Sequence, residues 1–203
     1  RVRLRPSKPR CAQMTVLNTL YTALVVVWGG SELWLGWYRR SGDRNRSQDH
    51  GTLRLLQWTI YLCIFLGVWF SYAHFWPVPA TTQHLLTPIG LLLMVLGLDF
   101  RWRAIRVLGR HFTVDVTIGE DHQIVRSGPY RWLRHPSYTG ALATFLGFAL
   151  CQGDGISLLI ILIPVFAVFL RRIHIEEAAL AQAFPIEYPA YARQTRRLLP
   201  GIW

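Results

Sequence analysis

Two short segments hold most of the side chains that could do chemistry. The first is 128–140, with the sequence GPYRWLRHPSYTG, and the second is 171–177, with the sequence RRIHIEE. Both place cationic side chains with tyrosine or glutamate directly beside long apolar stretches. Charged groups are costly to hold at the edge of a membrane, so dense groups of them indicate a functional site. Acids, cations and aromatic rings together suit a charged organic ligand.

Apolar blocks make up most of the remaining chain. Its 203 residues are 52% hydrophobic and 16% charged, which is too apolar for an ordinary soluble domain. A membrane-spanning helix needs about 20 mostly apolar residues. We therefore predict an all-α integral membrane bundle of about five transmembrane helices, with a small cytoplasmic loop and a C-terminal segment. The blocks that form these helices are 14–38, 53–76, 85–98, 138–150 and 156–170.

The charge pattern predicts how the helices are oriented. The net charge is +11, and Lys and Arg flank the apolar blocks instead of forming one basic surface. Such flanks mark the cytoplasmic side, so we expect membrane lipids as partners and no nucleic acid. The arginines of 101–110 and the C-terminus then lie inside and the N-terminus outside. The basic residues of 1–10 oppose this, so the orientation of the first helix stays open.

The two polar segments are expected to meet. The blocks 138–150 and 156–170 are separated by QGDG, which predicts a tight helical hairpin. Its second helix continues as an amphipathic stretch over 171–184. The entry of the first helix and the exit of the second then lie side by side, which brings together Arg134, His135, Tyr138, Glu176 and Glu177.

Between the third and fourth blocks the sequence turns polar. Residues 112–118 alternate between apolar and polar at the period of a strand, and Gly119-Glu120-Asp121 favours a reversal of the chain. This predicts a small loop or hairpin outside the membrane. The three cysteines are widely spaced and form no CxxC pair, so neither a disulfide framework nor a metal site is predicted.

The ordered segments GPYRWLRHPSYTG, RRIHIEEAALAQAF and EYPAYARQTRRLLPGIW resemble the isoprenylcysteine carboxyl methyltransferase family and its phospholipid methyltransferase relatives. In its length the chain resembles a short, prokaryotic-type member of the family. The resemblance divides the chain into N-terminal transmembrane helices over 1–110, about three in number, and a catalytic methyltransferase region over 111–203. It also implies the inner membrane of a prokaryote, with the active site facing the cytoplasm.

The resemblance implies methyl transfer from S-adenosylmethionine to a lipophilic acceptor. That acceptor could be an isoprenylcysteine-like carboxylate, an isoprenoid, a small thiol or a phospholipid. The catalytic residues are expected to be Arg134, which would orient the acceptor, and Glu177. The expected cofactor-binding residues are His122, Val125, Gly128, Tyr130, His135, Pro136, Tyr138, Glu176, Glu177, Tyr188, Tyr191 and Arg197.

The identity of the acceptor decides whether the site needs a base. Methyl transfer is an in-line displacement, so the protein mainly aligns and desolvates the partners. A carboxylate needs no base, whereas a thiol or an amine would require His135 or Glu177 to remove a proton. The sequence leaves this choice open, along with the oligomeric state and which of the paired acids contacts the cofactor.

Two other functions remain as alternatives. Membrane sterol reductases, which use NADPH, have a similar C-terminal half. Their Asn at the position of Ser137 and their Asp after the final Gly are absent here, where Ala141 follows Gly140. A non-catalytic membrane protein would leave the two polar segments without a common task.

Overall fold

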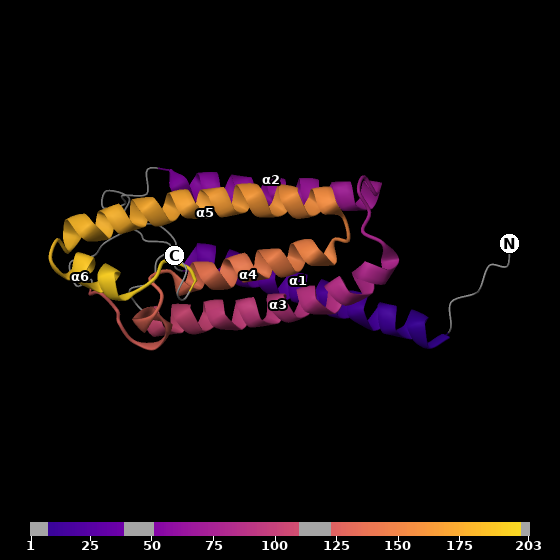
Figure 1. Cartoon of the computed structure of the whole chain (residues 1–203), viewed down its shortest axis with the longest axis horizontal. Coiled ribbons are helices and arrows are strands. Elements are labelled where there is room, and N and C mark those ends of the chain that lie inside the picture. Colours follow the sequence, from indigo (N-terminus) through magenta and orange to yellow (C-terminus); the bar gives the residue numbers. More distant parts are fainter. Residues whose placement is uncertain (1–7, 39–50, 110–122, 200–203) are drawn as a thin grey trace.

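The apolar blocks become long helices in the computed structural model, which describes residues 8–38, 51–109 and 123–199. Figure 1 shows α1 to α5 running side by side, with α6 at one end of the bundle. We call that end the site end. In chain order the elements are α1 (Lys8–Tyr38), α2 (Thr52–Ala73), α3 (Ala80–Leu108), the 3-10 helix η2 (Gly128–Arg131), α4 (Pro136–Cys151), α5 (Gly155–Ala183) and α6 (Glu187–Gln194).

The lengths of the helices confirm the predicted all-α membrane bundle. Within the described ranges, α2, α3, α5 and the Thr15–Trp37 part of α1 are long and apolar enough to cross a membrane. The remaining helix of the bundle, α4, is shorter. It has 16 residues and is about 24 Å long at 1.5 Å per residue. It packs along α3. The chain is therefore an integral membrane protein.

Three helices extend well beyond their apolar blocks, and the first of them, α1, begins at Lys8 and not at residue 14. The third block was predicted to begin at Leu85, but α3 begins at Ala80, so the connection from α2 is shorter than the predicted one. Pro79 is the residue before the first turn, and its carbonyl accepts hydrogen bonds from the Thr82 and Gln83 amides. The helix α5 continues past the fifth block to Ala183, as the amphipathic pattern predicted. The strand pattern over 112–118 lies outside the described residues.

Small residues let α3 and α4 approach closely. A methyl group added to Gly97 would lie 2.7 Å from the Gly140 carbonyl oxygen, and one added to Gly140 would lie 2.6 Å from the Gly97 carbonyl oxygen. Small residues at such crossings are typical of membrane helix pairs. The resulting close contact fixes the start of α4, which carries the first polar segment, against α3.

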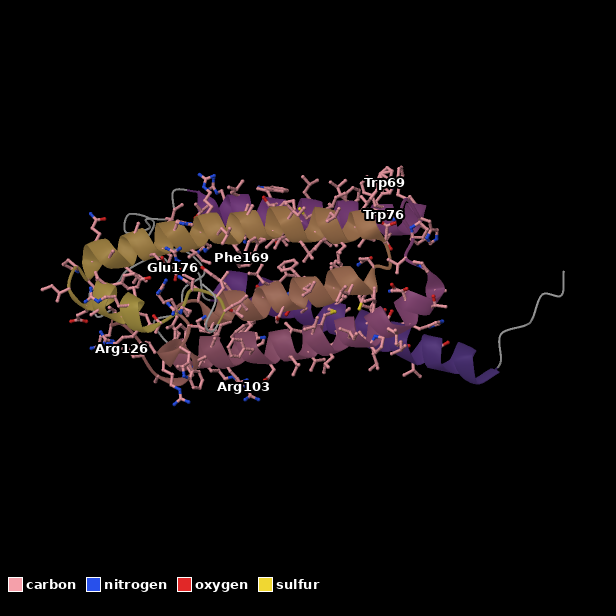
Figure 2. All side chains as sticks on the ribbon, in the orientation of Figure 1. Trp69, Trp76, Arg103, Arg126, Phe169 and Glu176 are labelled. Carbon is pink, nitrogen blue, oxygen red and sulfur yellow. The ribbon has the colours of Figure 1, made fainter. Side chains whose placement is uncertain are left out.

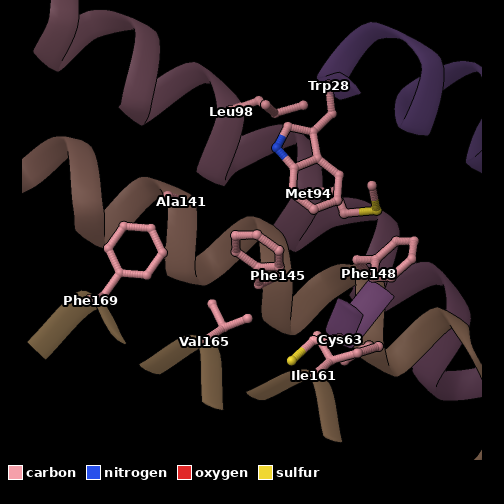
Figure 3. Close-up of a cluster of buried hydrophobic side chains, with 11 residues drawn as sticks. Trp28, Cys63, Met94, Leu98, Ala141, Phe145, Phe148, Ile161, Val165 and Phe169 are labelled. Carbon is pink, nitrogen blue, oxygen red and sulfur yellow. The ribbon is translucent and has the colours of Figure 1, made fainter. Parts of the chain in front are cut away.

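An aromatic layer joins the α3–α4 pair to α1 and α5 (Figure 3). Trp28 of α1 packs edge-on against Phe145 of α4, with ring centroids 4.8 Å apart. On the α5 side, Ile161 and Val165 are completely buried in the same cluster. Interdigitated rings of this kind fix the lateral spacing of the helices that carry the polar segments.

The predicted α4–α5 hairpin is confirmed, and its turn is bound to the α2–α3 connection. Asp154 caps α5 by accepting from the Ser157 amide at 2.9 Å, and its other oxygen accepts from the Trp76 amide at 2.7 Å. The Gly155 amide donates to the Trp76 carbonyl at 2.9 Å. The turn therefore sets how far α5 extends past the start of α4 at the site end.

Candidate active site

The segment after α6 runs alongside the first polar segment. The Arg134 amide donates to the Arg196 carbonyl at 2.7 Å, and the His135 amide donates to the Arg197 carbonyl at 3.1 Å. One helical turn later, the Thr139 hydroxyl donates to the Leu198 carbonyl at 2.7 Å. Leu133 and Arg196 thus form a parallel bridge, which places the side chain of Arg197 beside the start of α4.

One buried tyrosine, Tyr191, attaches α6 to the loop before α4, and a second, Tyr188, lies beside it. The Tyr191 hydroxyl donates to the Tyr130 carbonyl at 2.7 Å. Burial raises the pKa of Tyr191 to about 12, so this hydroxyl keeps its proton at neutral pH. Burial also raises the pKa of Tyr188, and the nearby negative charge of Glu177 adds to the effect. Both phenols therefore remain hydrogen-bond donors under physiological conditions.

Glu177 is the centre of the charged cluster. Its Oε1 accepts from Arg134 Nε at 2.7 Å and lies 3.4 Å from His135 Nε2, while its Oε2 accepts from Arg197 Nε at 2.9 Å. The side chains of Arg134 and Glu177 are only 11% and 13% exposed. Charge-assisted bonds at this depth are strong, and removing one partner leaves a buried charge uncompensated. Glu177 therefore holds both arginines in place.

Arg134 also binds the polypeptide backbone near α6. Its Nη1 donates to the carbonyls of Ala192 and Thr195, both at 2.8 Å. Because a guanidinium has five N–H donors in a fixed plane, these bonds and the Glu177 bond hold the whole group in one orientation. Lysine could not replace them.

Glu176 is held less completely than Glu177. The Tyr138 hydroxyl donates to Glu176 Oε2 at 2.8 Å, and His135 Nδ1 lies 3.9 Å from the same oxygen. The Glu176 side chain is 32% exposed. Figure 2 shows it at the site end, beside α6. Of the two acids, Glu176 is therefore the one with room to bind a further group.

The rings of His135 and Tyr138 stack face to face. Their centroids are 5.4 Å apart and their planes differ by 2°. Phe169 of α5 packs edge-on against Tyr138, with centroids 5.2 Å apart. This arrangement gives the cluster an aromatic wall on the α4 side.

The structure thus brings together most residues that the sequence singled out. Pro136 is buried as the first residue of α4. Gly128 lies farther away, in a turn with φ of 58° packed against Val107 of α3, and Val125 is partly buried in the segment leading to it. His122 lies outside the described residues. The residues that meet are Arg134, His135, Tyr138, Glu176, Glu177 and Arg197, with Tyr130, Tyr188 and Tyr191 beside them.

Sequence reasoning missed Arg172, which is 3% exposed and whose Nε donates to the Tyr138 hydroxyl at 2.9 Å. A signal existed, because Arg172 precedes Glu176 by four residues and so lies on the same face of a helix. Thr139 and Thr195 were missed too. Their contacts are with backbone atoms, which leave no pattern in the sequence.

Comparisons with known proteins identify relatives of this chain. The profile of the phospholipid methyltransferase family matches residues 85–187, just over half of the chain. Protein-S-isoprenylcysteine O-methyltransferase A of Arabidopsis thaliana is 30% identical over 74% of this chain and 71% of its own length. The Saccharomyces cerevisiae protein-S-isoprenylcysteine O-methyltransferase is 34% identical over 58% of this chain. The present chain covers only 50% of that yeast relative.

A solved structure has the same fold. It is that of a eukaryotic intramembrane Ras methyltransferase, isoprenylcysteine carboxyl methyltransferase. The match has a TM-score of 0.63 and 24% sequence identity, and covers 92% of this chain and 67% of the other. The shared fold includes nearly the whole bundle.

Proposed function

Since this chain belongs to the phospholipid methyltransferase family and is a membrane methyltransferase, we propose a specific reaction for it. In this reaction, the enzyme transfers a methyl group from S-adenosylmethionine to a lipophilic carboxylate. The catalytic region is 111–203, and the helices of 1–110 support it. We place the enzyme in the inner membrane of a prokaryote with the site end facing the cytoplasm, where the arginines of α3 gather.

The observation that carries the proposal is the convergence of two acids, two arginines and stacked aromatic rings on one cluster. S-adenosylmethionine carries an ammonium, a carboxylate and an adenine, and it supplies an electrophilic methyl group on its sulfonium. A donor set of this kind fits these groups. The Tyr188 hydroxyl fits as well, because it is buried beside Glu177 and makes no hydrogen bond of good geometry within the described chain. A ligand would satisfy it.

In this proposal Glu176 and Glu177 have different roles. Both oxygens of Glu177 already accept from arginines, so Glu177 orients Arg134 and Arg197. Glu176 is the partner of the ammonium group, because it is more exposed and is bound through Oε2 to Tyr138. His135, Tyr138 and Tyr188 form the walls.

A carboxylate acceptor suits the cluster better than a thiol or an amine. Glu177 is held by two guanidinium groups, and both ring nitrogens of His135 face carboxylate oxygens. Neither group is directed at an incoming acceptor as a base would be. Arg134 uses Nε and Nη1 for protein contacts, and we assign its Nη2 to the acceptor carboxylate. A carboxylate is already a nucleophile, so the chain's task is to align and desolvate it.

The test combines binding with product analysis in detergent. Calorimetry should show micromolar binding of S-adenosylmethionine, strongly weakened in Glu176→Ala. Methyl label from S-adenosylmethionine should then enter an S-prenylated cysteine with a free carboxyl group and be released by mild base, as expected of a methyl ester. Label in phosphatidylethanolamine instead would overturn the carboxylate assignment. Binding of NADPH without binding of S-adenosylmethionine would overturn methyl transfer itself.

A further inference from the structure

We propose that Arg172 is a positioning residue that orients Glu176 through the Tyr138 hydroxyl and thereby sets the affinity for the ammonium end of S-adenosylmethionine. The inference rests on the proposed function, because it assigns the ammonium group to Glu176. It adds a residue that never touches the ligand.

Arg172 is not a surface anchor. Its side chain is buried, whereas the adjacent Arg171 is exposed. Holding a guanidinium away from water is costly unless its donors are used. One donor, Nε, is directed at the oxygen of Tyr138 at 2.9 Å. Arg172 lies one turn before Glu176 on α5. From there its buried side chain can influence the site through Tyr138.

The chemistry of the three groups fixes the direction of the hydrogen bonds. A guanidinium can only donate, so the Tyr138 oxygen must accept from Arg172. The hydroxyl proton is then left for Glu176, whose Oε2 lies 2.8 Å away. With Oε2 bound in this way, Oε1 is the oxygen of Glu176 that we assign to the ammonium group of S-adenosylmethionine. Arg172 thus decides where the Tyr138 proton points, and that proton decides how Glu176 is oriented.

Packing keeps this connection rigid. The Tyr138 ring lies against His135 at 5.4 Å and against Phe169 at 5.2 Å. A ring packed on two sides cannot swing to a new position when one partner is lost. Loss of Arg172 would therefore free the hydroxyl proton to rotate, while the ring itself stays in place.

The test is a double-mutant cycle on the full chain in detergent, with S-adenosylmethionine as the probe. We expect Arg172→Gln and Tyr138→Phe each to weaken binding about tenfold, as loss of a hydrogen bond to a charged group does. In the double variant, the Arg172 substitution should add little, because its effect passes through the missing hydroxyl. The KM for the acceptor should stay unchanged, and Arg172→Lys should restore part of the affinity.

Arg171→Gln is the matched control and should bind like the wild type. If Arg172→Gln does not fold, Arg172→Lys compared in the wild-type and Tyr138→Phe backgrounds gives the same cycle. Unchanged affinity in the Arg172 variants, or losses that add fully in the double variant, would overturn the inference and leave the proposed function standing. Failure of the wild type to bind S-adenosylmethionine would overturn both.

Discussion

Arg101 of α3 binds Glu32 of α1 through two parallel hydrogen bonds, from Nε to Oε1 at 2.7 Å and from Nη2 to Oε2 at 2.8 Å. Its remaining nitrogen, Nη1, donates to the hydroxyl and carbonyl oxygens of Ser137 at 3.2 and 3.3 Å. Ser137 lies in the first turn of α4, next to Tyr138. One cation thus connects the first helix of the chain to the helix that begins at the site.

This ion pair predicts a measurable loss of stability in Glu32→Gln. Arg101 is only 11% exposed and would lose its charged partner, whereas Glu32 is 38% exposed and partly screened. We expect the free energy of unfolding to fall by about 1 to 2 kcal/mol, less than for a fully buried pair. Thermal unfolding in detergent measures it. Asp99→Asn is the control, because its pair with Arg103 is exposed on both sides; an equal loss there would contradict the prediction.

Glu177→Gln is expected to release the segment after α6. The amide would remove the negative charge that holds Arg134 and Arg197, at a cost of about 3 to 5 kcal/mol for breaking a buried pair. Faster trypsin cleavage beside Arg196 and Arg197 would report the release. Glu176→Gln keeps both of these ion pairs and should be cleaved at the wild-type rate. Equal cleavage of the two variants would show that Glu177 does not hold the segment.

Arg134→Lys should be nearly inactive although it keeps the charge. Lysine cannot reach Glu177 and the carbonyls of Ala192 and Thr195 together, as Arg134 does. We expect kcat/KM to fall about a hundredfold, corresponding to roughly 2.7 kcal/mol of lost stabilisation. Methyl-transfer kinetics test this. The exposed Arg193→Lys serves as control, and activity near the wild-type level in Arg134→Lys would remove Arg134 from the catalytic role.

Gly140→Ala is expected to push α3 and α4 apart. The added methyl group would lie 2.6 Å from the Gly97 carbonyl oxygen and 2.7 Å from the Arg101 amide nitrogen, both parts of a backbone that cannot yield locally. Overpacking of this kind costs about 1 to 3 kcal/mol. Gly30→Ala is the matched control, since a methyl group there meets nothing within 4 Å. The thermal midpoints of the two variants should therefore differ clearly, and equal midpoints would argue against the close crossing.

Asp154 predicts a loss of stability in acid. Burial alone raises the pKa of its carboxyl, but hydrogen bonds from the Ser157 and Trp76 amides outweigh burial and lower the pKa below its ordinary value. A lowered folded-state pKa contributes stability above the unfolded pKa, near 4, and that stability is lost as the pH falls through the folded pKa. The thermal midpoint should fall between pH 5 and pH 3, by less in Asp154→Asn. If the thermal midpoints of the wild type and of Asp154→Asn fell equally with pH, the lowered pKa would not be the cause of the acid sensitivity.

The sequence predicted contacts between neighbouring segments of the chain better than contacts between residues far apart in the sequence. The QGDG turn and the adjacent apolar blocks predicted the α4–α5 hairpin, and the hairpin predicted that Arg134 and Glu177 would meet. The extent of α3 was underestimated, because Thr81, Thr82 and Gln83 are polar although they form its first turn. The pairing of Arg101 with Glu32 joins residues 69 positions apart, and no local period indicates which helices become neighbours.

The pairing of Arg134 and His135 with Arg196 and Arg197 has a consequence for how the protein is made. All five long helices precede Arg196 in the chain, so they can leave the ribosome and enter the bilayer before the pairing forms. At that stage Glu177 lacks Arg197, and Arg134 lacks the carbonyl of Thr195. A nascent chain whose long helices are already inserted is therefore still catalytically incompetent, and it becomes competent only after the segment that holds Arg196 and Arg197 has left the ribosome and paired with the start of α4.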